Sequence, residues 1–197
     1  LAAGLVWMIT LAPKDPVQES FVQALKDGVA FMRSEPVLLR LAIVLGCANF
    51  LAMLTITVQV LFAQDVLALD AMTYGIILSI AAAGAIAGSL SAPVMIRLFG
   101  TQRCLYFALA AWGVGSGVVG ISQSGVTMAI ALFSNMFAAM VWNVITVSWR
   151  QRRIPAELLG RVNSIYRFFG WGSMPLGSLA GGAIVAVLEP DLGRELA

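Results

Sequence analysis

The sequence predicts an all-α polytopic membrane protein, and three observations support that fold class. Hydrophobic residues make up 60% of the chain and charged residues 11%, whereas soluble domains contain roughly 45–50% and about 25%. Five apolar stretches are each long enough to cross a hydrocarbon core of about 30 Å as a helix. The basic residues gather in alternate connections between these stretches, which is typical of a membrane protein with a fixed orientation.

The predicted transmembrane spans follow one another with short polar connections. Ser34 and Pro36 are helix start signals at the beginning of the first span. We expect spans over about 37–62, 72–96, 104–121, 126–149 and 162–188.

The two ends of the chain are predicted to differ from these spans. Residues 1–12 are apolar but fall short of the about 20 residues that a membrane crossing needs, and they lack the basic start of a signal peptide. We therefore expect 1–12 to be the end of a transmembrane helix and the chain to be a fragment of a larger protein. Residues 189–197 are polar and are expected to form an external loop.

Residues 13–36 are predicted to be a cytoplasmic amphipathic linker. Within it Phe21, Leu25, Val29 and Met32 recur at three- and four-residue spacing with polar residues between them, as in a helix with one apolar face. Two placements of that face are open, on the membrane surface or against neighbouring protein. Both keep the helix outside the hydrocarbon.

The distribution of basic residues predicts the orientation. Eleven of the twelve lie before or just within the first span, around 97–103, or in the segment 150–167, and Arg194 is the exception. The connections around Asp70 and Gln123 hold none. Because basic loops stay on the cytoplasmic side, the loop 150–161 is predicted to be cytoplasmic and the other two connections external. Basic residues confined to short loops also argue against binding of nucleic acid.

Several classes of chemistry are excluded by residue content. The chain has no histidine, which removes zinc-hydrolase sites and Ser-His-Asp triads. Cys47 and Cys104 lie in or beside apolar runs and are expected to be small buried residues, not a disulfide or a metal pair. None of the ten acidic residues lies within a predicted span, so a membrane-embedded enzyme would lack its acid–base group. No cofactor is expected.

Glycines recur at helical spacing within the spans. Gly115–Gly120 matches the GxGxxG nucleotide fingerprint, but no strand precedes it and no acidic residue follows about twenty positions later. Small residues at this spacing instead let a neighbouring helix backbone approach closely. We expect such contacts at Gly113, Gly117 and Gly120, at Gly84 and Gly88, and at Gly177 and Gly181.

Polar side chains within the spans are the candidate binding residues. Amides in hydrocarbon need partners, so they face other helices or a wet cavity. Asn135 and Trp142, seven apart, share a helix face that suits an amphipathic organic solute, and Asn143 is turned about 80° from Asn135. The alternative is that such amides bond neighbouring helices without a ligand. The candidates are Asn135, Trp142, Asn143, Asn49, Gln59 and Arg167, the last of which either reaches the membrane interface or faces the cavity.

The segment 142–182 carries the most specific pattern in the chain, an arginine-rich connection followed by a span rich in glycine. Its characteristic residues are Arg150-Gln151-Arg152, Pro155, Leu159-Gly160-Arg161-Val162-Asn163-Ser164, Tyr166-Arg167, Pro175-Leu176-Gly177 and Gly181-Gly182. This pattern resembles the second half of a major facilitator superfamily transporter and is most similar to the multidrug and enterobactin exporter-like branch. The resemblance implies the C-terminal six-helix half of that fold, incomplete: the end of the sixth helix, the central linker and helices seven to eleven of twelve.

The resemblance also implies roles for particular residues. The family's conformational motif, in which proline and glycines let a helix bend, is matched by Arg161, Pro175, Gly177, Gly181 and Gly182. The family's short cytoplasmic loop motif is matched by Arg97, Gly100 and Arg103, but its aspartate is missing here.

By the same resemblance, the chain is expected to be part of a secondary active transporter in the plasma membrane of a bacterium. Such a protein exports small organic solutes or drugs by alternating access. Its expected partners are the lipid bilayer, the missing N-terminal half of the same chain and a small-molecule solute. If export is coupled to protons, the titrating carboxylate lies outside this chain. The alternatives are an importer of the same superfamily and a non-catalytic permease or anchoring subunit driven by a partner ATPase.

Overall fold

The structure, a computed structural model, describes residues 20–195 of the chain. This part contains six α-helices and one π-helical segment, and no strand lies within it. The all-α fold class is therefore confirmed for the described residues. The expected helix end over 1–12 and the linker before Ser20 lie outside them.

Five of the helical segments are long and apolar enough to cross a membrane. Each contains most of one predicted span. In chain order the elements are α2 (Phe21–Ser34), α3 (Pro36–Leu61), η1 (Phe62–Val66), α4 (Ala71–Phe99), α5 (Thr101–Gly120), α6 (Gly125–Arg153) and α7 (Ala156–Glu195).

The structure corrects two of the predicted loops. The arginine-rich loop 150–161 is mostly helical, because α6 continues to Arg153 and α7 begins at Ala156. The polar segment 189–197, expected to be an external loop, is helical as far as Glu195. Arginine, glutamate and leucine are good helix formers, so the end of an apolar run does not mark the end of its helix.

The short connections are set by local signals. Asp70 caps α4 by accepting a hydrogen bond from the Thr73 backbone N–H at 2.8 Å, and Ser124 caps α6 by accepting one from the Thr127 N–H at 3.3 Å. The hydrogen bonds from Thr73 lower the pKa of the Asp70 carboxyl. Gly100 joins α4 to α5 with a φ of 82°, a conformation that favours glycine. The turn itself therefore requires the glycine of the predicted loop motif.

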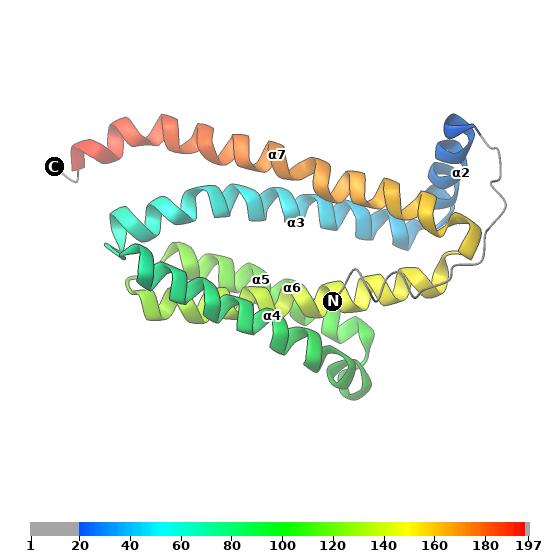
Figure 1. Cartoon of the computed structure of the whole chain (residues 1–197), viewed down its shortest axis with the longest axis horizontal. Helices are drawn as coiled ribbons and strands as arrows, with labels where there is room; N and C mark the ends of the chain where they lie inside the picture. Colours follow the sequence, from blue (N-terminus) through cyan, green and yellow to red (C-terminus); the bar gives the residue numbers. More distant parts are fainter. Residues whose placement is uncertain (1–19, 196–197) are drawn as a thin grey trace, which may run out of the picture.

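The membrane-crossing helices form two groups (Figure 1). One group is α3 packed along α7, and the other is α4 and α5 packed on α6. Helix α2 crosses α7 and contacts it near one end of α7 (Figure 1). Helix α6 is the most buried of the five spans. The others expose large apolar side chains, such as Leu90 at 74% and Val187 at 72%, as expected for helices in contact with lipid.

A pair of glycines four residues apart joins the main helices of each group. A Cβ on any of the four would overlap or crowd a carbonyl oxygen of the facing helix, so only glycine lets the two backbones come this close. The prediction is confirmed for both pairs: Gly84 and Gly88 of α4 face Phe133 and Phe137 of α6, and Gly177 and Gly181 of α7 face Phe50 and Leu54 of α3.

The third predicted glycine contact is wrong. Among the described residues, nothing lies within 4 Å of a Cβ built on Gly113, Gly117 or Gly120. Gly115 makes the close contact instead, against the Asn135 side chain of α6. At 100° per residue, Gly115 is turned about 160° from Gly117. Helix α5 therefore meets α6 with nearly the opposite side from the one that the glycine spacing indicated.

Candidate functional site

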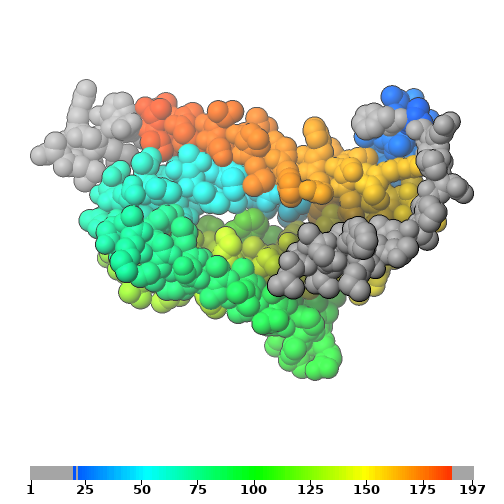
Figure 2. Space-filling view, viewed as in Figure 1, coloured from blue at the N-terminus to red at the C-terminus, as the bar shows by residue number. Residues whose placement is uncertain are grey.

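A cavity of about 600 Å³ lies between the two groups of helices, where α3 faces α5 and α6. On the face drawn in Figure 2, the surface is hollowed along the boundary between the two groups. The cavity wall is mainly apolar with a few polar groups, which is the usual character of a small-molecule site. The polar or indole-bearing residues that line it are Thr55, Gln59, Trp112, Ser116 and Asn135.

Two of the amides predicted from the sequence lie in this wall. Gln59 of α3 is 8% exposed, and its Nε2 donates a hydrogen bond to the Tyr74 hydroxyl of α4 at 3.1 Å. Asn135 of α6 is 5% exposed, and its Nδ2 donates to the Ser116 hydroxyl of α5 at 3.4 Å. The fold thus brings together two amides that are 76 positions apart in the chain. Each also bonds a neighbouring helix, which was the alternative interpretation of these side chains.

Asn135 is not fully satisfied by its surroundings. Its Oδ1 atom is buried and has no hydrogen-bond partner among the described residues. The same atom lies against Gly115, where a Cβ would overlap it. A buried acceptor without a partner costs roughly 1–3 kcal/mol. The amide therefore adds less to stability than its burial suggests.

Trp112 and Ser116 are lining residues that the sequence interpretation did not select. They are four apart on α5 and therefore share a helix face. Their four-residue spacing is a signal in the sequence, but the glycines on either side of Ser116 favour an interpretation as a close helix contact. Among the residues that the structure describes, no charged side chain lines the cavity.

The structure does not bring the other four candidates to this cavity. Trp142 is buried among side chains of α4, α5 and α6, including Cys104 and Ala108. Asn143 is exposed on α6. Asn49 donates from Nδ2 to the Gly170 carbonyl of α7 at 2.8 Å, so it joins α3 to α7.

Arg167 is the fourth of these candidates. It is exposed, and its guanidinium lies 4.3 Å from the ring centre of Trp171. Whether Arg167 and the other three contact a solute stays a prediction.

A cluster of arginine contacts joins the helices at the predicted cytoplasmic end. The Arg150 guanidinium lies 3.8 Å from the ring centre of Tyr166 and donates to Asn163 Oδ1 at 3.2 Å. The Tyr166 hydroxyl donates to the Leu41 carbonyl of α3 at 3.3 Å. Residues of α6, α7 and α3 are thereby linked by one set of contacts. Arg153 pairs with Glu35 at 2.8 Å and so ties α6 to the junction of α2 and α3.

The motif residues outside this cluster differ in their surroundings. Arg97 and Arg103 are exposed on either side of Gly100, and no close neighbour lies near Gly182 among the described residues. Pro175 is exposed on α7, one turn after Trp171. The loop motif therefore consists of exposed positions, whereas the conformational motif combines exposed Pro175 and Gly182 with Gly177 and Gly181, which are buried against α3.

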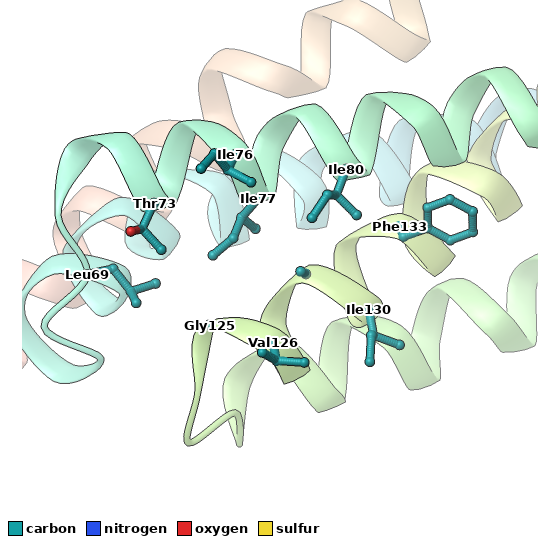
Figure 3. A pocket seen from close by; sticks show the side chains of 10 residues that line it. Leu69, Thr73, Ile76, Ile77, Ile80, Gly125, Val126, Ile130 and Phe133 are labelled. Atoms are coloured by element: carbon teal, nitrogen blue, oxygen red, sulfur yellow. The ribbon is translucent and has the colours of Figure 1, made fainter.

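A second cleft, of about 670 Å³, lies between one end of α4 and the start of α6 (Figure 3). Ile80 of α4 and Ile130 of α6 line it from its two helices (Figure 3). Thr73 supplies the polar group in its wall, and apolar side chains supply nearly all the rest. Because few polar groups could orient a solute there, the α3–α5–α6 cavity is the better candidate site.

Five membrane-length helices, of which α3, α5 and α6 line the cavity, identify this chain as a multi-pass membrane protein. The chain belongs to the major facilitator superfamily family described as transmembrane secretion effector, whose model matches residues 1–189. This match confirms the resemblance to the superfamily, which consists of membrane transporters and is not an enzyme class. No curated protein and no solved structure matched the chain.

Proposed function

We propose that this chain is part of a secondary active transporter that exports small organic solutes by alternating access. In this proposal the α3–α5–α6 cavity contributes to the solute site. The family description supports a secretion role, and the amides of Gln59 and Asn135, which line one cavity from α3 and α6, carry the argument. Two amides separated by apolar wall can orient a solute by hydrogen bonds while most of its surface is buried.

The lining favours a solute that is uncharged and amphipathic. A charge placed among apolar side chains without an opposite charge loses its hydration at a cost of several kcal/mol. The amides and the Ser116 hydroxyl could pair with a carbonyl, hydroxyl or amine of such a solute. The half-buried Trp112 offers an indole face for an aromatic ring.

The way the helices are paired supports a movement of rigid groups. The glycine contacts hold α4 directly on α6 and α7 directly on α3, whereas the cavity lies between these pairs. Rocking of packed helix groups around a central site is how alternating access works in transporters built from repeats. We propose that the membrane is the plasma membrane of a bacterium and that proton entry drives export, with the titrating carboxylate outside this chain.

The test is export of an uncharged fluorescent lipophilic dye, such as Nile red, from cells that produce the full-length protein. We expect slower dye accumulation than in cells without it, and dissipation of the proton gradient should remove the difference. Faster accumulation would instead identify an importer.

A pair of matched variants connects export with the cavity. Gln59→Leu should reduce export per folded molecule several-fold, because one cavity hydrogen bond contributes on the order of 1 kcal/mol. Gln102→Leu is the control, since Gln102 is exposed on α5 and bonds Tyr106 of the same helix. Equal export by both variants would remove the cavity from the proposal.

A further inference from the structure

We propose that a pocket between α2 and α7 binds an anionic phospholipid of the surrounding membrane. The pocket has a volume of about 780 Å³ and lies where α2 crosses the predicted cytoplasmic end of α7. Its walls come from Ala24, Leu25 and Val29 of α2 and from α7 between Gly160 and Phe169. None of these residues lines the solute cavity, so the inference does not depend on the proposed function.

The crossing of the two helices makes this a defined pocket. Gly28 lies where α2 meets α7: a Cβ there would come within 2.6 Å of the end of the Ile165 side chain and within 3.4 Å of Arg161 Cβ. Asp27 and Arg161 form an ion pair at 3.2 Å beside this contact. Met32 is 3% exposed in a cluster that includes Ile165. The two walls are therefore held in a fixed relation to one another.

The α7 wall changes from polar to aromatic along its length. Arg161 and Ser164 line the pocket at the start of the helix, and Phe168 and Phe169 line it one to two turns later. At 1.5 Å per residue, the two levels are separated by roughly 6–12 Å along the helix axis. A phospholipid has the same order, with a phosphate above its acyl chains. Phe168 is 75% exposed and Phe169 49%, so an acyl chain has an open apolar surface to cover.

Further basic residues lie on the two helices that form the pocket. Lys26 and Arg33 are three and four residues from Val29 and thus lie on the neighbouring stripe of α2. Arg167 lies one residue before Phe168 on α7, at the level of the aromatic wall, and stacks on Trp171, which is 60% exposed. Tryptophan and arginine at this level are typical of the membrane interface.

The balance of charge favours an anionic headgroup over a zwitterionic one. Lys26, Arg33, Arg161 and Arg167 are the basic groups around the pocket. The acidic groups of α2 and of the first turns of α7 are Asp27, which is paired with Arg161, and Glu157, one turn before Arg161. The surplus of positive charge attracts anionic lipid, and Arg161, which also pairs with Asp27, is the charged side chain in the described pocket wall.

Native mass spectrometry of the full-length protein, titrated with phosphatidylglycerol and with phosphatidylcholine, tests this site. We expect the wild type to prefer phosphatidylglycerol, and Lys26→Gln with Arg33→Gln to weaken its binding by about tenfold while phosphatidylcholine binding stays unchanged. The matched control is Arg97→Gln with Arg103→Gln, two exposed arginines of the α4–α5 connection. Equal binding of the two lipids by the wild type, or an equal loss in both double variants, would overturn the proposal.

A photocrosslinker locates the occupant directly and does not depend on the charge variants folding. Phe168 is replaced by benzoylphenylalanine in the full-length protein, at a position where the side chain is mostly exposed. Irradiation in native membranes should attach phospholipid to α7. Attachment to another protein segment would show that protein covers this pocket, and the lipid site would then be wrong.

Discussion

Replacing Asn135 by alanine separates a binding role from a packing role. The substitution removes the hydrogen bond to Ser116, which at 3.4 Å is long, and it also removes the buried Oδ1 that has no partner. Bonds between membrane helices average about 0.6 kcal/mol, whereas an unpaired buried acceptor costs roughly 1–3 kcal/mol. The space left behind joins an existing cavity of about 600 Å³, so little packing is lost. We therefore expect a free energy of unfolding that is unchanged or higher by up to about 2 kcal/mol.

Solute transport should respond in the opposite direction. Loss of one amide from the cavity wall is expected to weaken solute affinity by about 1 kcal/mol, a roughly fivefold effect. The assay measures the thermal unfolding midpoint of purified full-length protein together with dye export per folded molecule. Ser134→Ala is the control, since the Ser134 hydroxyl donates to the Ile130 carbonyl of its own helix at 2.9 Å. A lower midpoint for Asn135→Ala, with export per molecule unchanged, would refute the reasoning and identify the amide as a packing element.

Three further predictions test the helix contacts, the orientation and the dependence on the rest of the protein. Gly84→Ala should sharply reduce the yield of folded protein, because its Cβ would overlap the Phe133 carbonyl. Gly113→Ala should be tolerated, because alanine favours a helix over glycine by about 0.5–1 kcal/mol and space is available there. The thermal unfolding midpoints of both variants test these two expectations, and equal midpoints would contradict them. A cysteine at position 156 should react with an impermeant reagent only after cell lysis, whereas one at position 123 should react on intact cells. Labelling at 156 in intact cells would reverse the predicted orientation. The 197-residue segment reconstituted alone in vesicles should not move dye, because a site at the middle of the membrane needs both halves; dye movement above that of empty vesicles would contradict this.

The fold class and the approximate spans could be predicted from the sequence because both depend on the length and position of the apolar runs along the chain. Apolar length alone decides whether a segment can cross the bilayer. The C-terminal ends of α6 and α7 could not be predicted from apolar length. Arg150 to Arg153 extend α6, and the residues up to Glu195 extend α7, beyond the apolar runs. Gly84, Gly88, Gly177 and Gly181 were recognised as contact residues because small side chains four apart have few other uses in a membrane helix.

The candidate site was predicted only in part. Gln59 and Asn135 were selected because an amide within a span needs a partner, and the structure places both in one cavity wall. Asn49 has the same side chain as Asn135 and is likewise surrounded by apolar residues in the sequence. Its amide nevertheless donates a hydrogen bond to the Gly170 carbonyl and joins α3 to α7. Composition could not separate these amides, since both kinds of environment satisfy the same need for a hydrogen bond.

The sequence by itself determined that the chain is a bundle of membrane helices and which segments form them. Only the tertiary structure decided which side of each helix meets which neighbour, as Gly115 shows by contacting α6 in place of Gly117. In a soluble protein the apolar stripe of a helix marks its buried side. In a membrane, the side of a helix that faces lipid and the side that faces protein are both apolar. The apolar pattern therefore does not identify the packed side, which only the arrangement of the helices shows.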